Sequence, residues 1–274
     1  MKMRRWGVLA LASLGLAAAA DLDLELRSRV EAFKGSGDWQ EVRFRKSFPV
    51  DQTAILICDM WDNHWCKGAV SRVVPLAQKM SPLIDAARAH GVQIIHAPSE
   101  TMDFYKDLPQ RLAILAVPRV EPPPSLGLSD PPLPIDDSSG GCDTPDKFYK
   151  AWTREIATLH ITGNDVVSDS GPQIYSFLRQ RGIRNLLFMG VHTNMCVLNR
   201  TFAIKKMTNW GIRCVLVRDL TDTMYNPKDR PYVSHSQGTE LVVEHIEKYW
   251  CPTTLSGEVM RALQKTGGGR QQTE

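Results

Sequence analysis

Apolar runs of strand length alternate along the chain with segments in which apolar residues recur at helical spacing. The strand-like runs lie at 54–58, 92–96, 158–161, 186–189 and 213–217. Helical spacing predicts helices over 72–90, around 174–182, from 196 to about 209 and over 237–249. This alternation predicts an α/β fold, three-layered and doubly wound, with helices on both faces of a parallel sheet.

The carboxyl ends of these strands bring candidate chemistry to one edge of the sheet. Asp59 follows the first run, Asp219 follows the last, and a turn from Gly190 leads into a helix that begins near Cys196. Open α/β sheets bind ligands at this edge. A thiol at a helix start is also favoured as thiolate by the helix dipole. The alternative is a structural cysteine, since free Cys is among the most buried residue types.

The remaining segments divide the chain into a core domain and its additions. We expect the α/β domain over 51–255, preceded by a polar lead-in over 21–50 with a short helix near 24–33. Within the domain, 98–158 holds seven prolines between 118 and 134 and predicts a long excursion over the surface, or lid. Residues 256–274 predict a flexible tail.

The N-terminus has the pattern of a signal peptide over 1–20. Lys2, Arg4 and Arg5 precede an apolar stretch, and Ala18 to Ala20 supply small residues for cleavage. We therefore expect export, to a periplasm or outside the cell, with no stable membrane insertion after cleavage. A retained N-terminal anchor is the alternative.

Composition narrows the classes of partner. The net charge of +3 and the lack of a basic stripe with aromatics argue against nucleic acid, and a small-molecule substrate remains. No GxGxxG or GxxxxGK[ST] motif follows the first strand, so nucleotide binding loses support. Six cysteines form no CxxC pair, and one disulfide among Cys66, Cys142 and Cys251 is possible.

Three motifs resemble those of the isochorismatase-like cysteine hydrolases, a group that includes nicotinamidase and N-carbamoylsarcosine amidohydrolase. They are the segment 55–60, whose apolar strand ends at Asp59, the helix end 178–183, and the turn 190–197, which reads G-V-H-T-N-M-C-V. The resemblance implies a six-stranded parallel sheet and a homo-oligomer. It also implies an Asp–Lys–Cys triad.

Carried onto this sequence, the resemblance makes Cys196 the nucleophile and Asp59 the base. Backbone amides near His192 and Thr193, and that of Cys196, would form the oxyanion hole. A non-proline cis peptide would lie near Val191-His192. Such amides stabilise the negative charge that forms when a thiol attacks an amide carbonyl.

The sequence departs from the family at the lysine. The segment 159–165, where the lysine is expected, contains none. The third member is therefore absent, replaced, or supplied from elsewhere, and Lys106 is a weak candidate.

The nicotinamidase branch of the family also binds a metal through Asp and His near the second strand. Here that region holds only His96, so we expect no catalytic metal and no cofactor, although His64, His96 and Asp103 could be neighbours. Trp61 and His64 are candidates for the substrate pocket. Packing under a loop is the plainer role for Trp61.

These observations predict an exported cysteine hydrolase that cleaves a C–N bond of a small amide through a Cys196 acyl-enzyme. Vinyl-ether hydrolysis of the isochorismatase type is an alternative, although that branch typically lacks the cysteine. A further alternative is a non-catalytic small-molecule-binding or interaction protein on the same fold, lacking the family lysine.

Overall fold

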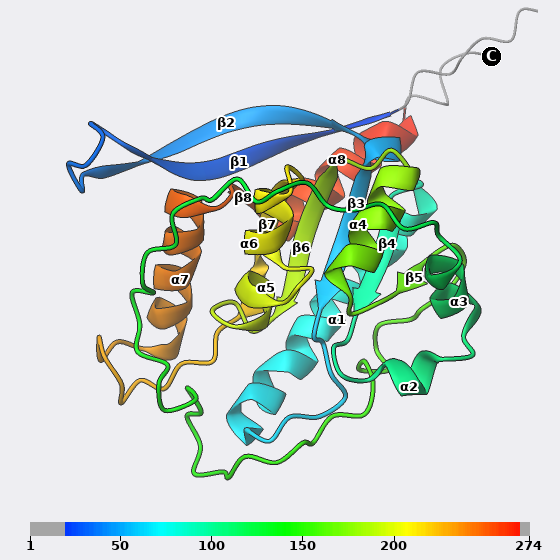
Figure 1. The fold of residues 1–274 in the computed structure, drawn as a ribbon. Helices are drawn as coiled ribbons and strands as arrows, with labels where there is room; N and C mark the ends of the chain where they lie inside the picture. Colours follow the sequence, from blue (N-terminus) through cyan, green and yellow to red (C-terminus); the bar gives the residue numbers. More distant parts are fainter. Residues whose placement is uncertain (1–19, 269–274) are drawn as a thin grey trace, which may run out of the picture.

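The computed structural model describes residues 20–268, so the predicted signal peptide falls almost entirely outside the described residues. One mixed sheet of eight strands runs through the molecule in the order β2-β1-β8-β7-β6-β3-β4-β5 (Figure 1). The strands are β1 (Asp21–Glu31), β2 (Trp39–Pro49), β3 (Thr53–Cys58), β4 (Gln93–Ala97), β5 (Val166–Val167), β6 (Asn185–Val191), β7 (Arg213–Asp222) and β8 (Thr253–Thr254). Those from β8 to β5 are parallel.

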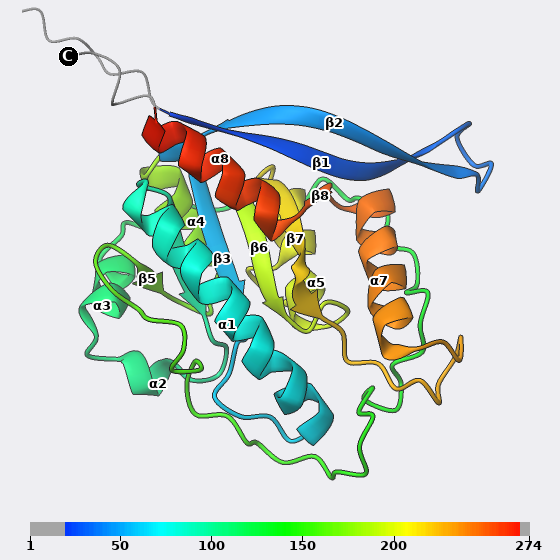
Figure 2. The ribbon, with the colours of Figure 1, turned by 180° about the vertical axis from the view of Figure 1, so that it is seen from behind.

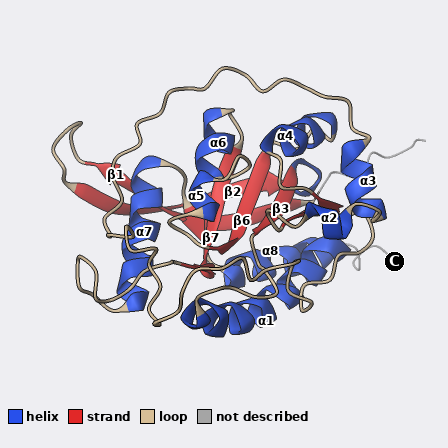
Figure 3. Cartoon of the chain, turned by 60° about the horizontal axis from the view of Figure 1, so that its bottom comes forward, coloured by secondary structure: helices blue, strands red, loops and turns tan. Residues whose placement is uncertain are grey.

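Helices cover both faces of the parallel strands, as the alternating pattern predicts. They are α1 (Lys67–Ala89), α2 (Met102–Tyr105), α3 (Pro109–Leu115), α4 (Gly171–Gln180), α5 (Cys196–Asn199), α6 (Ile204–Asn209), α7 (His235–Tyr249) and α8 (Ser256–Gly268). Helices α1 and α8 lie on one face, while α4, α6 and α7 lie on the other (Figures 2 and 3). Among the described residues, no helix combines the length and the apolar character needed to cross a membrane.

Strand β3 shows why the sheet is buried on both sides. Ile55 and Ile57 pack into the core beneath α1 and α8, whereas Ala54, Leu56 and Cys58 pack into the core beneath α4, α6 and α7. Such two-sided burial is why parallel strands read as continuous apolar runs in the sequence.

Two terminal predictions were wrong. Residues 21–49 form an antiparallel hairpin of β1 and β2, without a helix near 24–33. Leu22, Leu24 and Leu26 alternate with polar residues, a period of two that favours a strand. At the other end, 256–268 form α8 instead of flexible tail, because Val259 and Leu263 are four residues apart and buried against the sheet.

The strand near 158–161 was also misplaced. That segment is a turn, and the edge strand β5 instead pairs Val166 and Val167 with Ile95 and His96. The six parallel strands that the resemblance implied are present, and the hairpin adds the two antiparallel ones.

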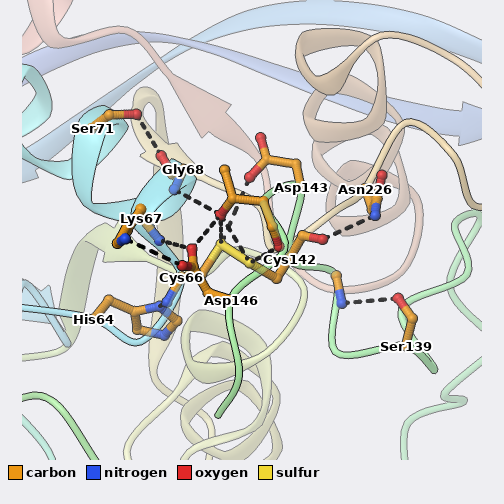
Figure 4. Close-up of a disulfide and its surroundings, with 12 residues drawn as sticks. His64, Cys66, Lys67, Gly68, Ser71, Ser139, Cys142, Asp143, Asp146 and Asn226 are labelled. Atoms are coloured by element: carbon orange, nitrogen blue, oxygen red, sulfur yellow. Dashed lines mark hydrogen bonds and ion pairs between the residues drawn. A yellow bond between two sulfur atoms is a disulfide. The ribbon is translucent and has the colours of Figure 1, made fainter. Parts of the chain in front are cut away.

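The Pro-rich excursion contains α2 and α3 and then, over 117–158, a segment without helices that we call the strap. The strap passes the outer side of α4, α6 and α7 and returns below the carboxyl ends of the strands (Figure 3). A disulfide joins Cys142 of the strap to Cys66, which precedes α1 (Figure 4). Cys251 is a buried free thiol. Arg72 adds a second link by pairing with Asp143.

Candidate active site

Asp59 lies at the carboxyl end of β3 and is fully buried. Its backbone takes a left-handed conformation with φ of 47°, which is uncommon for residues other than Gly. The amide of Ser99, after β4, donates to Asp59 Oδ1 at 2.7 Å. Burial raises the pKa of Asp59, although Arg200, Cys196 and Ser99 each act to lower it. The carboxyl is thus shielded from solvent and held from several sides.

The turn after β6 carries Cys196 to the same edge. Gly190 lies directly against β3, and a Cβ there would clash with the Cys58 carbonyl, so a residue without a side chain is needed. The peptide Val191-His192 is cis, as the resemblance implied. Four residues later Cys196 begins α5. Adjacent pairing of β3 and β6 therefore places the two turns side by side.

Cys196 and Asp59 meet across this edge. The thiol and the carboxylate interact, which acts to lower the pKa of Asp59 and to raise that of Cys196. Burial is the largest cause of the raised pKa of Cys196, followed by the charge of Asp59. The expectation of a dipole-stabilised thiolate is therefore wrong, because α5 is only four residues long and burial outweighs it. In the resting site the protonated thiol of Cys196 is therefore favoured, with the Asp59 carboxyl group beside it.

Arg200 places a positive charge beside Asp59, where the resemblance to the family predicts a lysine. Its Nε lies 3.0 Å from Asp59 Oδ2, and its Nη1 lies 3.1 Å from Glu100 Oε1. The charge of Arg200 acts to lower the pKa of both Asp59 and Cys196. Lys106, in contrast, is exposed after α2, and within 20–268 it makes no hydrogen bond or ion pair with the two residues.

Arg200 was missed because the lysine was sought on the strand before α4. The sequence nevertheless carried a signal, since Arg200 follows Cys196 by four residues and such pairs share one face of a helix. Its amide donates to the Cys196 carbonyl at 3.1 Å, so the chain completes a helical turn between them.

The predicted oxyanion hole is only partly available. The Thr193 amide donates to the Asp222 carbonyl at 2.8 Å, which removes it as a donor to a ligand. The His192 amide points toward the Cys196 sulfur and acts to lower the pKa of the thiol. Neither this amide nor that of Cys196 has another acceptor among the described residues. Both amides are therefore available to donate to a ligand.

Trp61 and His64 lie on the other side of Asp59, in the loop after β3. With His192 and Asp59 they line a small cavity. Trp61 stacks on Trp152 of the strap with ring centroids 4.3 Å apart, and its Nε1 donates to the Ser99 carbonyl. Trp61 thus both packs under the strap and borders the site.

The two histidines of this cavity are neutral at physiological pH. His64 Nδ1 accepts from the Cys66 amide at 3.1 Å, and burial lowers the pKa of His64 to about 4. Burial also lowers the pKa of His192 to about 3. The cavity wall therefore presents polar but uncharged rings beside the Asp59 carboxylate.

Cys196 itself opens onto a wider groove beneath the strap. Its lining includes Leu133, Asp137, Asn194, Met195, Asn199, Arg200 and Lys205. The groove has a volume of about 550 Å³, large enough for a small molecule to approach the sulfur.

His96 and Asp103, which the sequence offers with His64 as candidate metal ligands, do not lie together. His96 is fully buried, with Nδ1 2.6 Å from Glu155 Oε2 and Nε2 3.3 Å from Asp165 Oδ2. Asp103 is exposed on α2. Both nitrogens of His96 are thus committed to carboxylates of the protein.

Comparison with known proteins places this arrangement in a family. The isochorismatase domain model matches residues 53–231, so the chain belongs to the isochorismatase family. That membership supports a hydrolase function. No curated protein matches the chain in sequence.

The fold is also supported by a solved structure with a TM-score above 0.5. A cysteine hydrolase from Pseudomonas syringae pv. phaseolicola 1448A is 18% identical with a TM-score of 0.52, over 80% of this chain and 95% of that one. An isochorismatase family protein from Burkholderia thailandensis is 17% identical with a TM-score of 0.46, over 78% and 96% respectively. The matched model begins at β3, so the β1–β2 hairpin lies outside it.

Proposed function

We propose that the protein is a cysteine hydrolase that cleaves the C–N bond of a small amide, with Cys196 as nucleophile and Asp59 as base. The observation that carries the proposal is the convergence of a thiol, a buried carboxylate and a guanidinium at one sheet edge. Nucleophile, base and orienting group in mutual contact are the signature of covalent catalysis.

The first half-reaction follows from this arrangement. The sulfur of Cys196 attacks the amide carbonyl while Asp59 takes the thiol proton, so no free thiolate is needed. The amides of His192 and Cys196 donate to the resulting oxyanion. Collapse of this intermediate breaks the C–N bond, and Asp59 returns the proton to the leaving amine. A thioester on Cys196 remains.

Water then completes the cycle. Asp59, again ionised, accepts a proton from a water molecule that attacks the thioester carbonyl. The second tetrahedral intermediate expels the sulfur, which takes the proton back from Asp59, and the carboxylic acid product leaves. Arg200 favours the ionised form of the buried Asp59 between the two steps, because its charge opposes the effect of burial on the carboxyl pKa.

In this proposal the groove admits the substrate, and the cavity, with a volume of about 20 Å³, has room for about one water molecule. The groove beneath the strap gives access to the sulfur, while the cavity between Trp61, His64 and His192 lies beside Asp59. Because both histidines are neutral, the cavity suits an uncharged group. A non-catalytic binding protein remains the competing function, but the contact of Arg200 with Asp59 removes the missing cation as an argument for it.

We also propose that the protein is exported. The basic and apolar pattern of residues 1–20 supports this location. The disulfide between Cys66 and Cys142 adds support, because such bonds persist mainly in oxidising compartments.

The test is a screen of small neutral amides with purified protein, read out by amine release and by intact mass. A turned-over amide should add its acyl mass to the protein, and peptide mapping should place that mass on Cys196. Cys196→Ala should abolish both signals, while Lys79→Ala on the exposed side of α1 should keep them. An acyl adduct that persists in Cys196→Ala, or turnover without need of Cys196, contradicts the proposal.

A further inference from the structure

The β1–β2 hairpin leaves the sheet with one long open edge. Strand β2 is the outermost strand, and none of the described strands pairs with its outer side. The hairpin extends well past α7 (Figures 1 and 2). Exposed strand edges of this length readily pair with another strand, so natural proteins usually block or use them.

The hairpin is held rigidly in this projecting position. Arg27 pairs with Glu240 and with the buried Glu247 of α7, each at 2.6 Å. Arg29 reaches Glu244 at 3.1 Å. At the start of β2, the Trp39 ring contacts Tyr249 edge to face, with centroids 5.2 Å apart. An edge fixed in this way is already in its binding conformation, which lowers the entropic cost of association.

We propose that β2 pairs antiparallel with β2 of a second copy of this chain, about a twofold axis at Val42. In that register Glu41 faces the partner's Arg43, and Asp38 faces the partner's Lys46. Each pair occurs twice because the interface is self-complementary. The inference is independent of the proposed hydrolase activity.

Charge selects this register over its neighbours. An axis shifted by one residue toward the hairpin tip would place Glu41 opposite itself, and the opposite shift would do the same for Arg43. Like charges directly opposite each other destabilise a strand pair, whereas opposite charges stabilise it. Centring on Val42 is the register that puts an uncharged residue on the axis and opposite charges on either side.

The ends of the proposed contact are free to engage a partner. Asp38 and Lys46 are exposed, and neither forms an ion pair within the described part of the chain. Phe44 is 41% exposed and would face the partner's Gln40, which would cover part of its ring. The charges of β2, and that of Asp38 just before it, thus complement those of a second copy. Glu41 and Arg43 pair with each other within one chain at 2.9 Å, and in the proposed contact each would also face its counterpart on the partner.

Charge reversal tests the register. We expect the wild-type chain to sediment as a dimer. Asp38→Lys and Lys46→Asp should each weaken dimerisation about tenfold, because two attractive pairs become repulsive. The double variant should restore the wild-type dissociation constant. Lys34→Asp in the hairpin turn, outside the proposed contact, is the matched control.

Cross-linking tests the axis directly. Val42→Cys places two thiols opposite each other, within reach of a short bifunctional thiol reagent. Gln40→Cys places its thiols about 14 Å apart along the strands and should not cross-link. Covalent dimer from Val42→Cys alone supports the proposal. A monomer at every concentration, or a dimer that neither reversal weakens, overturns it, as does equal cross-linking of both cysteine variants.

Discussion

Arg200 Nε lies 3.0 Å from Asp59 Oδ2, four residues after the cysteine that the same carboxylate faces. The cation beside Asp59 therefore comes from the segment that carries Cys196, instead of from the strand before α4, where the resemblance to the family predicts a lysine. Asp59 is fully buried, whereas the Arg200 guanidinium is partly exposed. The ion pair therefore offsets the cost of burying the Asp59 carboxyl group, which has little other contact with charged groups. The charge balance of the site depends on this pair.

Arg200→Gln should reduce kcat/KM for a turned-over amide about 100-fold, as expected for loss of a preorganised charge. Since Arg200 lowers the pKa of Asp59, its removal raises that pKa further. The acidic limb of the kcat/KM profile should then move to higher pH, because Asp59 must be ionised to act as base. Arg200→Lys should restore part of the rate.

Lys106→Ala distinguishes the two candidate cations. The exposed Lys106 makes no described contact with the site, so this variant should keep wild-type kcat/KM and pH dependence. If instead Lys106→Ala is inactive while Arg200→Gln is not, the assignment of the cation is wrong.

The Arg200→Gln variant should also be less stable. Its free energy of unfolding in urea should fall by roughly 3 kcal/mol, because the substitution leaves a buried charge without its partner.

The thiol of Cys196 should be unreactive toward simple alkylating agents at neutral pH. Burial and the charge of Asp59 raise its pKa, so the fraction of thiolate is small and grows with pH beyond 9. Alkylation by iodoacetamide, followed by peptide mass spectrometry, should accelerate with pH and show no plateau below 9. A titration midpoint below pH 7 would contradict the proton placement.

Asp59→Asn separates base catalysis from thiol ionisation. Removing the carboxylate removes a charge that raises the pKa of Cys196, so alkylation at pH 8 should become faster. Hydrolysis should be lost at the same time, because no base remains to accept the thiol proton. Slower alkylation in Asp59→Asn would show that the carboxylate activates the resting thiol.

The α/β core was predictable because its strands are buried on both faces and read as continuous apolar runs. Asp59 was predictable because it directly follows such a run at the end of β3, and Cys196 because it begins the helix after the short turn that follows β6. The hairpin was missed although Leu22, Leu24 and Leu26 alternate with polar residues. That period of two is typical of a strand, so the sequence contained the signal.

The missing cation was harder to place for a different reason. A residue that acts through its side chain can come from any segment that reaches the carboxylate. Arg200 lies one helical turn past Cys196, a spacing visible in the sequence but shared with many surface arginines. Only the folded contact with Asp59 distinguishes it. The pairing of Cys66 with Cys142 was open for the same reason, because it joins segments 76 residues apart.

The disulfide between Cys66 and Cys142 should stabilise the strap over the site. Closing a loop of this length contributes about 4 kcal/mol in the chain-entropy description. Cys66→Ser/Cys142→Ser should therefore unfold at lower urea concentration, and limited proteolysis should cut first within the strap. Reductant should shift the wild-type protein toward the variant and leave the variant unchanged. Equal stability with and without reductant would show that the bond contributes little.

The buried His96 should make stability fall as pH rises above neutral. Burial alone would lower its pKa, but Glu155 and Asp165 on its two nitrogens outweigh this and raise the pKa to about 9. Because the folded pKa exceeds the unfolded value of about 6.5, the stabilisation is complete below pH 6.5 and is lost between 6.5 and 9. The loss amounts to roughly 3 kcal/mol.

His96→Gln isolates this contribution. The difference in unfolding free energy between wild type and His96→Gln, measured in urea from pH 6 to 9.5, should shrink as pH rises. His160→Gln, at an exposed histidine nearby in sequence, should keep the wild-type pH dependence. If the difference between wild type and His96→Gln stays constant over this window, His96 is neutral in the folded protein. A proton held within the buried cluster would then reside on the carboxyl group of Glu155 or Asp165 instead.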